Sequence, residues 1–214
     1  MRLIFLGPPG AGKGTQAARV AEHYKLSHIA TGDMLRRALE LRTELGLKAK
    51  PFMEKGQLVP DELTIPMFVE RIGEQDAQKG FILDGFPRNV EQAELLDQVL
   101  DEMGAQLDKV LKFMVLGIEL VARLSGRRFC PVCKSVYHLV KQPPKIEGFC
   151  DKDGAALEQR PDDNEEAILE RLEVYGEKTK PLFDFYAGRG LLVDVDAIGS
   201  TDVVFGRLLS AIDR

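Results

Sequence analysis

The sequence lacks an excess of positive charge. Its 214 residues carry 29 lysines and arginines against 34 aspartates and glutamates, which gives a formal net charge of -5. A general nucleic-acid binder needs a basic face to offset phosphate repulsion, so this balance argues against nucleic acid as a partner. It still permits a discrete phosphorylated ligand, held by a local group of arginines within an acidic surface.

Long apolar runs are also missing. No run approaches the ~20 residues that a membrane-spanning helix needs, and the N-terminal apolar run, residues 2–6, is only as long as a strand before glycine interrupts it. We therefore expect no membrane partner, no signal peptide and a cytoplasmic location. Internal repeats and low-complexity tracts are absent as well, and the 44% apolar and 29% charged content is ordinary for a globular protein.

Cysteine is scarce, and the three residues present fall within one short region. An odd, clustered count in a cytoplasmic chain predicts a metal site before a disulfide. Cys130-Pro-Val-Cys133 and Cys150-Asp-Lys-Asp153 form two similar knuckles, with Asp153 where a fourth cysteine would stand. Because Zn²⁺ accepts a carboxylate oxygen in place of one thiolate, these four residues predict a structural zinc site.

Other interpretations of this segment stay open. Asp151 and His138 are rival fourth ligands, although spacing favours Asp153. The cysteines could instead lie reduced in a small core, or Cys130 and Cys133 could form a disulfide. A zinc-ribbon module for nucleic acid is conceivable but lacks the basic face. The segment has little apolar mass and needs another source of stability, which favours the metal.

The sequence does contain a glycine loop between an apolar strand and a helix. Residues 7–15 read G-P-P-G-A-G-K-G-T and match the phosphate-binding pattern G-x-x-x-x-G-K-[ST] as far as Lys13. Backbone N–H groups, a helix N-terminus and the lysine would hold a polyphosphate from several sides. Gly14 stands where Ser or Thr is usual, and the hydroxyl comes one position later at Thr15, which weakens the case for direct Mg²⁺ ligation by that residue. The alternative, a plain glycine-rich turn with a surface lysine, does not account for the flanking strand and helix.

A second apolar run, Gly80-Phe-Ile-Leu-Asp84, ends on a carboxylate. A buried central strand of an open α/β sheet delivers such a residue to the edge where ligands bind, and in phosphate-loop proteins it lies near Mg²⁺. A lone aspartate here could also be a helix cap, but Arg88 follows four residues later and favours the functional interpretation.

Strand patterns alternate with helix patterns along the chain, which predicts an α/β fold with a five-stranded parallel sheet and helices on both faces. We expect Thr31 or Asp33, Asp61 and Asn89 to cap helices. Two stretches, 31–60 and 127–163, break the alternation and are predicted to be movable inserts. The strands are expected at 2–6, 25–30, 80–84, 109–116 and 191–195. The helices after the first are expected at 34–41, 49–54, 61–72, 90–103, 118–126, 164–187 and 202–212. Pro181 is expected to bend or interrupt the helix 164–187.

These residues resemble one family, the bacterial adenylate kinases with a long zinc-bearing lid, over nearly the whole chain. The motifs that carry the resemblance are 7–15, T-G-D-M at 31–34, G-Q-L-V-P-D at 56–61, G-F-I-L-D-G-F-P-R at 80–88, L-S-G-R-R at 124–128, the cysteine unit and R-P-D-D-N-E-E at 160–166. The resemblance implies reversible phosphoryl transfer from MgATP to AMP, giving two ADP. It also implies a core of 1–30, 61–126 and 164–214, an AMP-binding insert at 31–60 and a lid at 127–163.

The resemblance further implies roles for individual residues. Those that would surround the transferring phosphoryl group are Lys13, Arg88, Arg123, Arg127, Arg160 and Arg171, with Asp84 orienting Mg²⁺ through its waters. ATP would contact Gly10, Ala11, Gly12, Lys13, Gly14, Thr15, Arg127, Val136, Tyr137 and Gly199. AMP would contact Thr31, Arg36, Gln57, Leu58, Val59, Gly85, Phe86, Pro87, Arg88, Gln92, Arg160 and Arg171. Asp162 and Asp163 would steer the lid arginines.

A phosphate acceptor that is already ionised needs no general base, and none is evident. Two rivals remain from the sequence: a monophosphate kinase for another base, such as a GTP:AMP or UMP/CMP kinase, and a nucleotide-binding regulatory module without catalysis. Gln92 and Thr31 favour AMP, and the number of arginines favours catalysis. The resemblance suggests a monomer.

Overall fold

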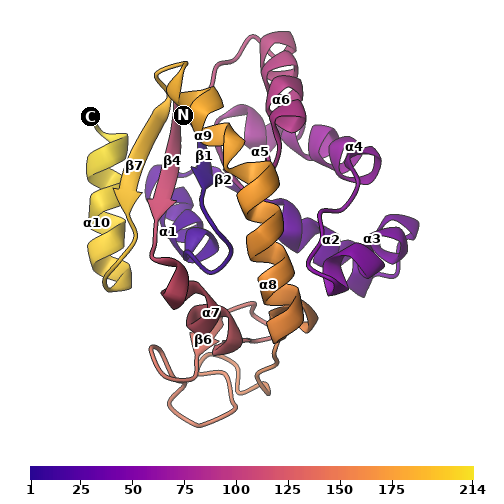
Figure 1. Ribbon diagram of the computed structural model, residues 1–214, viewed down its shortest axis with the longest axis vertical. Coiled ribbons are helices and arrows are strands. Elements are labelled where there is room, and N and C mark those ends of the chain that lie inside the picture. Colours follow the sequence, from indigo (N-terminus) through magenta and orange to yellow (C-terminus); the bar gives the residue numbers. More distant parts are fainter.

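The computed structural model describes residues 1–214, apart from the side chain of Ile118. Its centre is a five-stranded sheet in which every neighbouring pair is parallel, in the order β2-β3-β1-β4-β7 (Figure 1). The predicted sheet is thereby confirmed. The strands are β1 (Arg2–Leu6), β2 (Ser27–Ala30), β3 (Phe81–Asp84), β4 (Lys109–Met114) and β7 (Leu192–Asp196).

Helices cover both faces of this sheet. On one face α1 (Lys13–Tyr24) packs beside α10 (Thr201–Ile212), and their buried residues share a core cluster with the strands. On the other face a second cluster joins α4 (Asp61–Ile72), α6 (Val90–Glu102) and α9 (Pro181–Ala187) to the sheet, with the short α5 (Gln75–Gln78) beside them. Because both faces are covered, the central strands are apolar runs rather than alternating ones: Leu3 to Leu6 are all buried.

The two stretches that break the alternation form separate small units. Residues 31–60 contain α2 (Thr31–Glu40) and α3 (Glu44–Glu54), which pack on each other around Leu35, Ala49 and Val59. Beyond α7 (Gly117–Ser125), a two-stranded antiparallel ladder of β5 (Arg127–Phe129) and β6 (Val136–His138) carries the cysteine region. In Figure 1 this region lies at the foot of the view, below α7 and α8 (Glu165–Val174).

Two of the predicted helix caps are wrong. Helix α2 begins at Thr31 itself, after Ala30, so neither Thr31 nor Asp33 caps it, and α4 begins at Asp61, after Pro60. The side chains of Thr31 and Asp61 bind distant partners instead, whereas Asp33 pairs with Arg36 on its own helix. The hydroxyl of Thr31 donates to the carbonyl of Gly85, and Asp61 accepts hydrogen bonds from α6. The cap at Asn89 is confirmed, since its side chain accepts from the N–H of Gln92 at 2.7 Å.

The predicted long helix 164–187 is interrupted, as expected, but before Pro181 rather than at it. A π-helical stretch, Tyr175–Thr179, separates α8 from α9. Proline lacks the N–H that would continue the ladder, and the N–H of Lys180 bonds five residues back to Tyr175. Within this stretch the Thr179 hydroxyl donates to the carbonyl of Arg88 at 2.8 Å, so the irregular turn is hydrogen-bonded to the loop that follows β3.

No helix among the described residues is both long enough and apolar enough to span a lipid bilayer.

Candidate functional site

The glycine loop joins β1 to α1 at the carboxyl edge of the sheet. Gly10 and Gly12 have φ values of +84° and +91°, which side chains with a Cβ rarely adopt, so the tight turn depends on glycine. No side chain among the described residues caps α1, and its first turn contains no acidic residue. The N–H groups and the positive end of the helix dipole at this terminus therefore face an anion site, and no acidic side chain of the helix's own first turn competes for them.

Lys13 folds back over the loop. Its Nζ donates to the carbonyls of Gly7 at 2.8 Å and Pro8 at 3.1 Å, which holds the ammonium against the first residues of the glycine loop. Burial lowers the pKa of Lys13 to about 8, with Asp84 acting against this shift and Arg88 adding to it. A buried cation with a depressed pKa is a group whose charge an incoming phosphate would stabilise.

Asp84 ends β3 beside the loop, as the sequence predicts. A Cβ on Gly14 would lie 3.1 Å from Asp84 Oδ2, so the carboxylate sits directly against the first turn of α1. His28 Nε2 lies 3.7 Å from the same oxygen. Although burial raises the pKa of Asp84, His28 and Lys13 outweigh it and hold the pKa below its usual value, so the carboxylate is charged.

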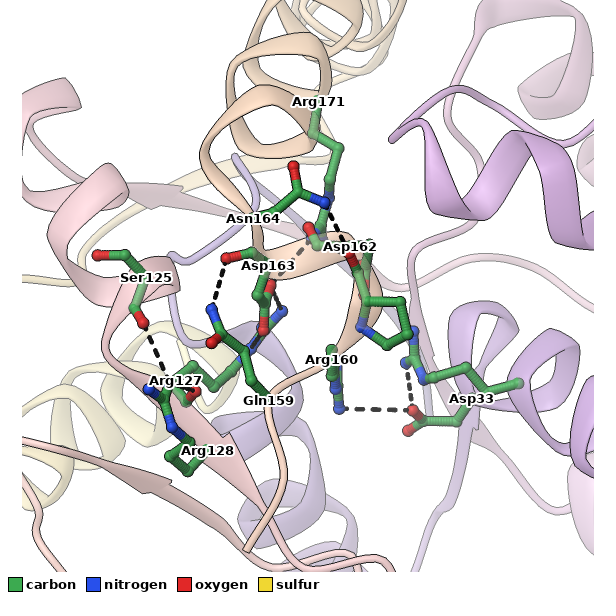
Figure 2. Close-up of polar contacts among 12 residues, drawn as sticks. Asp33, Ser125, Arg127, Arg128, Gln159, Arg160, Asp162, Asp163, Asn164 and Arg171 are labelled. Carbon is green, nitrogen blue, oxygen red and sulfur yellow. Dashed lines mark hydrogen bonds and ion pairs between the residues drawn. The ribbon is translucent and has the colours of Figure 1, made fainter.

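Six cationic side chains converge in front of the loop. Aspartates hold several of them, and Figure 2 shows the contacts of Arg127, Arg160 and Arg171. Arg127 grips Asp163 with two parallel hydrogen bonds, Nε to Oδ2 at 2.7 Å and Nη2 to Oδ1 at 2.5 Å, and the Asp163 side chain is fully buried. Arg171 Nη1 lies 2.8 Å from Asp162 Oδ2 and 3.4 Å from Asp163 Oδ1. The six cations are Lys13, Arg36, Arg88, Arg127, Arg160 and Arg171.

Burial and neighbouring charges both act on the pKa values of the side chains in this cluster. Burial, followed by the nearby charge of Arg171, lowers the pKa of Arg88 to about 10. Burial likewise lowers the pKa of Arg160 to about 10, helped by Arg36 and Arg127. Burial also acts to raise the pKa of Asp162, but Arg171 and Arg36 more than offset it, and the pKa stays below its usual value. Buried arginines that repel one another in this way form a site for a polyanion.

A cavity opens beside these arginines between the insert 31–60 and the end of β3. It is lined by Thr31, Gly32, Leu35, Arg36, Met53, Gly56, Gln57, Leu58, Val59, Thr64, Gly85, Arg88, Gln92, Asp162 and Arg171. Nine of the predicted AMP-binding residues are in this lining. Of the other three, Arg160 lies 3.9 Å from Asp33, which also pairs with Arg36, while Phe86 is buried against Phe68 and Pro87 follows it in a cis peptide bond.

A larger cavity of about 480 Å³ lies next to this one and shares Leu58 and Val59 with it. Its charged lining residues are Asp61, Glu91, Glu177 and Lys178. With three carboxylates and one cation, this lining repels phosphate. The smaller cavity, which contains three arginines, is therefore the better nucleotide site.

Three of the predicted residues are not part of the arginine cluster in this structure. Arg123 Nη2 donates to Glu119 on its own helix at 2.7 Å. Tyr137 is buried, and its hydroxyl lies 3.4 Å from Cys150 Sγ, so its side chain faces the cysteines. Gly199 lies in the loop between β7 and α10; Gln16 on α1 donates to the carbonyl of Thr201, the first residue of α10, at 2.8 Å. Beside Tyr137, the side chain of Val136 is 39% exposed.

Some lining residues were missed by the sequence analysis: Gly32, Leu35, Met53, Gly56 and Thr64. Leu35 lies one helical turn after Thr31, so helical spacing was a usable signal for it. Gly56 could not be found that way. It has a φ of +75°, and a Cβ there would lie 2.5 Å from the Ala167 carbonyl, because the insert packs tightly against α8 at this point.

The predicted metal ligands do come together. The ligand atoms of Cys130, Cys133, Cys150 and Asp153 all lie within 4.8 Å of one another. Each knuckle closes with the same pair of backbone bonds. In the first, Lys134 N–H donates to the Cys130 carbonyl and Cys130 N–H to the Ser135 carbonyl; in the second, Gly154 N–H donates to the Cys150 carbonyl and Cys150 N–H to the Ala155 carbonyl. Three thiols and one carboxylate at this spacing suit a four-coordinate Zn²⁺ ion.

Three of the rival interpretations, a Cys130–Cys133 disulfide and a fourth ligand from His138 or Asp151, are not supported. All three cysteines are free thiols, so the Cys130–Cys133 disulfide is absent from this described region. The Nδ1 of His138 accepts from the N–H groups of Val140 and Lys141, and Asp151 accepts from the N–H of Lys145. Both side chains are thus engaged away from the cluster, and the fourth ligand predicted from spacing is the one in place.

Comparisons with known proteins agree with this geometry. The family model described as adenylate kinase matches residues 5–191. The chain is 50% identical to the adenylate kinase of Carboxydothermus hydrogenoformans over the full length of both proteins, and 50% identical to that of Archaeoglobus fulgidus over all of this chain and 99% of the relative. It is 52% identical to the adenylate kinase of Bacillus subtilis over 95% of this chain and 93% of the relative. With a phosphate loop, an arginine-lined cavity and a match along nearly its whole length, this chain belongs to the adenylate kinase family.

Proposed function

We infer that the chain catalyses reversible transfer of the terminal phosphoryl group of MgATP to AMP, giving two ADP. The family match supports the reaction. One observation assigns it to these residues: six buried or half-buried cations converge between the phosphate loop and a second cavity that is lined by arginines. A nucleotide-binding module without catalysis would need only the loop.

The donor site is proposed at the glycine loop. Backbone N–H groups of Gly10 to Thr15 and the ammonium of Lys13 would hold the ATP phosphates, since the first turn of α1 contains no acidic residue of its own. The adenine would lie between the lid, near Arg127, the exposed Val136 and the backbone of Tyr137, and the backbone of Gly199.

The acceptor site is proposed in the smaller cavity. Its arginines, Arg36, Arg88 and Arg171, together with Arg160, would neutralise the AMP phosphate. Thr31, the 57–59 backbone and Gly85 would shape the nucleoside pocket, and Phe86 and Pro87 would fix the position of that wall. Gln92 would contact the adenine edge through its carboxamide.

Phosphoryl transfer asks the protein for in-line positioning and for positive charge where negative charge develops. Lys13, Arg88, Arg127, Arg160 and Arg171 would supply that charge around the transferring group. Asp162 and Asp163 would hold Arg127 and Arg171 in fixed rotamers, so little reorganisation is needed during the reaction. Arg123 would join them by exchanging Glu119 for phosphate oxygens.

The residues of this chain suit two metal ions, Mg²⁺ at the donor site and Zn²⁺ at the cysteine cluster. Mg²⁺ arrives with ATP and neutralises its phosphate charge; Asp84, ionised and pressed against Gly14, would orient the hydrated ion. Zn²⁺ would be held by the cysteine cluster as a structural ion, because all four ligand positions are filled by protein atoms and none is open for a substrate.

Water competes with AMP as the acceptor, so the site must close before transfer. We assign this closure to the insert 31–60 over AMP and the lid 127–163 over ATP, moving against a core of 1–30, 61–126 and 164–214. Lys134 of the lid lies 2.7 Å from Glu40 of the insert, so the two units are in contact in this structure. The protein is proposed to act as a cytoplasmic monomer, without a nucleic-acid or membrane partner.

The test is a coupled assay of ADP formation from MgATP with AMP, CMP, UMP and GMP offered in parallel. We expect turnover with AMP and a fall in kcat/KM of about 10²- to 10³-fold in Arg88→Ala, the range for losing one preorganised charge contact. Arg189→Ala is the control, because Arg189 pairs with Asp97 and is not in the arginine cluster. No ADP from any acceptor would overturn the proposal.

A further inference from the structure

The carboxamide of Gln92 is held in one orientation by two partners of opposite character. Its Nε2 donates to Asp61 Oδ1 at 2.5 Å, and its Oε1 accepts from the backbone N–H of Arg88 at 2.8 Å. A carboxylate can only accept and a backbone N–H can only donate. Turning the amide over would set two acceptors against each other at one end and two donors at the other, so only one orientation is satisfied.

Asp61 is itself held from α6. Its Oδ2 accepts from Asn89 Nδ2 at 3.2 Å, and Asn89 Oδ1 accepts from the N–H of Gln92. These three residues, through their side chains and the backbone N–H of Gln92, form a closed ring between the first turn of α4 and the N-terminus of α6. Gln92 is only 3% exposed, so its carboxamide has little freedom to choose another arrangement.

This ring leaves the amide of Gln92 with one N–H and one oxygen lone pair for a ligand in the smaller cavity, which Gln92 lines. Adenine presents an amino donor beside a ring-nitrogen acceptor. Hypoxanthine has nearly the same shape but presents a carbonyl acceptor beside a ring N–H donor. An amide fixed in one orientation can therefore hydrogen-bond to adenine, but it places donor against donor and acceptor against acceptor when hypoxanthine takes the same position.

We propose that Asp61 is a positioning residue that sets base selectivity at the acceptor site, by fixing which end of the Gln92 carboxamide is donor and which is acceptor. The inference rests on the proposed role of Gln92 against the adenine of AMP. Asp61 does not touch the nucleotide in this account; it acts through Gln92, and it also lines the larger cavity on the other side.

The experiment measures kcat and KM for AMP and for IMP with saturating MgATP. We expect the unmodified protein to prefer AMP by at least about 100-fold in kcat/KM, since a site built to hydrogen-bond a group rejects an analogue with the opposite group strongly. Asp61→Asn should reduce that ratio at least about tenfold, mainly by raising KM for AMP, with kcat changed less.

Glu62→Gln is the matched control. Glu62 is the next residue in the same helical turn and is exposed, so its variant also removes one carboxylate from the first turn of α4. It should leave the AMP:IMP ratio within about twofold. A purely structural role of Asp61 would lower kcat/KM for both nucleotides in equal proportion and leave the ratio unchanged, and that result would overturn the proposal.

A second variant keeps the test independent of how well Asp61→Asn folds. Asn89→Ser retains a good helix-cap side chain but removes the amide that donates to Asp61 Oδ2. It should lower the ratio in the same direction, by about threefold; an unchanged ratio counts against the ring. Gln92→Leu separates the two hypotheses. If it leaves the ratio intact, the role of Gln92 itself is wrong; if it abolishes the ratio while Asp61→Asn does not, only the role of Asp61 is wrong.

Discussion

At the scale of single residues, Gly14 shows how one position can depart from a motif for a physical reason. The general phosphate-loop pattern has Ser or Thr after the lysine. Here a Cβ at that position would stand 3.1 Å from Asp84 Oδ2, closer than most real contacts of this kind. Glycine therefore allows the strand-end carboxylate to lie against the first turn of α1, where it also faces Lys13.

Gly14→Ala should displace Asp84 and lower kcat/KM for MgATP by about tenfold, with a smaller effect on KM for AMP. Steady-state kinetics with each substrate varied in turn would measure this. Gly206→Ala is the matched control: it too is a glycine in a helix, but nothing lies within 4 Å of its added Cβ. It should keep full activity and stabilise the fold by about 0.5–1 kcal/mol. Equal activity of the two variants would contradict this account of Gly14.

At the scale of elements, the cysteine region has unusually little to hold it together. Its buried cluster consists of Cys130, Tyr137 and Cys150, with Ala155 and Leu157 packed against them, while Val140 and Ile146 are largely exposed. Burial of so little apolar surface stabilises only weakly. A metal bound to four side chains from two knuckles would replace the missing core.

We expect one Zn²⁺ per chain, and we expect its removal by a chelator to lower Tm by about 10 °C, the shift that a few kcal/mol produces in a chain of this size. Asp153→Ala should weaken zinc retention, whereas Asp151→Ala, which changes a carboxylate outside the cluster, should not. Metal analysis and thermal melts would measure both.

The separation of stability from chemistry can be checked on the same samples. Well below its melting temperature, the metal-free protein should retain kcat within about threefold if residues 127–163 still resist proteolysis. Loss of activity while that segment remains protected would mean that the zinc site takes part in turnover directly.

At the scale of the whole molecule, contacts bridge the two inserts across the site. Lys134, at the tip of the first knuckle, reaches Glu40 at the end of α2, and Arg160 lies 3.9 Å from Asp33 at the other end of that helix. Both residues of the Lys134–Glu40 pair are about half exposed, so the pair contributes on the order of 0.2–1 kcal/mol. That is enough to shift the balance between closed and open forms a few-fold.

Lys134→Glu should shift the nucleotide-free protein toward the open form, because it places two carboxylates opposite each other. The reversed pair, Lys134→Glu with Glu40→Lys, should restore the distribution. Fluorescence energy transfer between one dye on the lid and one on α3, at low salt, would measure it. The effect should fade as salt screens the charges. An unchanged distance distribution in the single variant would show that this contact does not influence closure.

Much of this fold could be predicted because its signals are local. The glycine loop, the five strands and the cysteine knuckles each consist of neighbouring residues, and a parallel sheet brings the carboxyl ends of its strands to one edge whatever the loops do. The cap at Asn89 was predictable for the same reason, since donor and acceptor are three residues apart.

The hydrogen-bond partners of the polar side chains could not be predicted from the sequence, because they depend on the tertiary structure. Asp61 and Thr31 looked like helix caps, but each bonds a group on a distant element, 31 residues away for Gln92 and 54 for Gly85. Asp163 grips Arg127 across 36 residues, and Gly14 is required by a carboxylate on another strand. The positions of most helices and strands, and the residue types at the phosphate edge, could be predicted because they depend on spacing along the chain. Which acid holds which base was left to the packing, because burial forces each polar group to take whatever partner the fold places beside it.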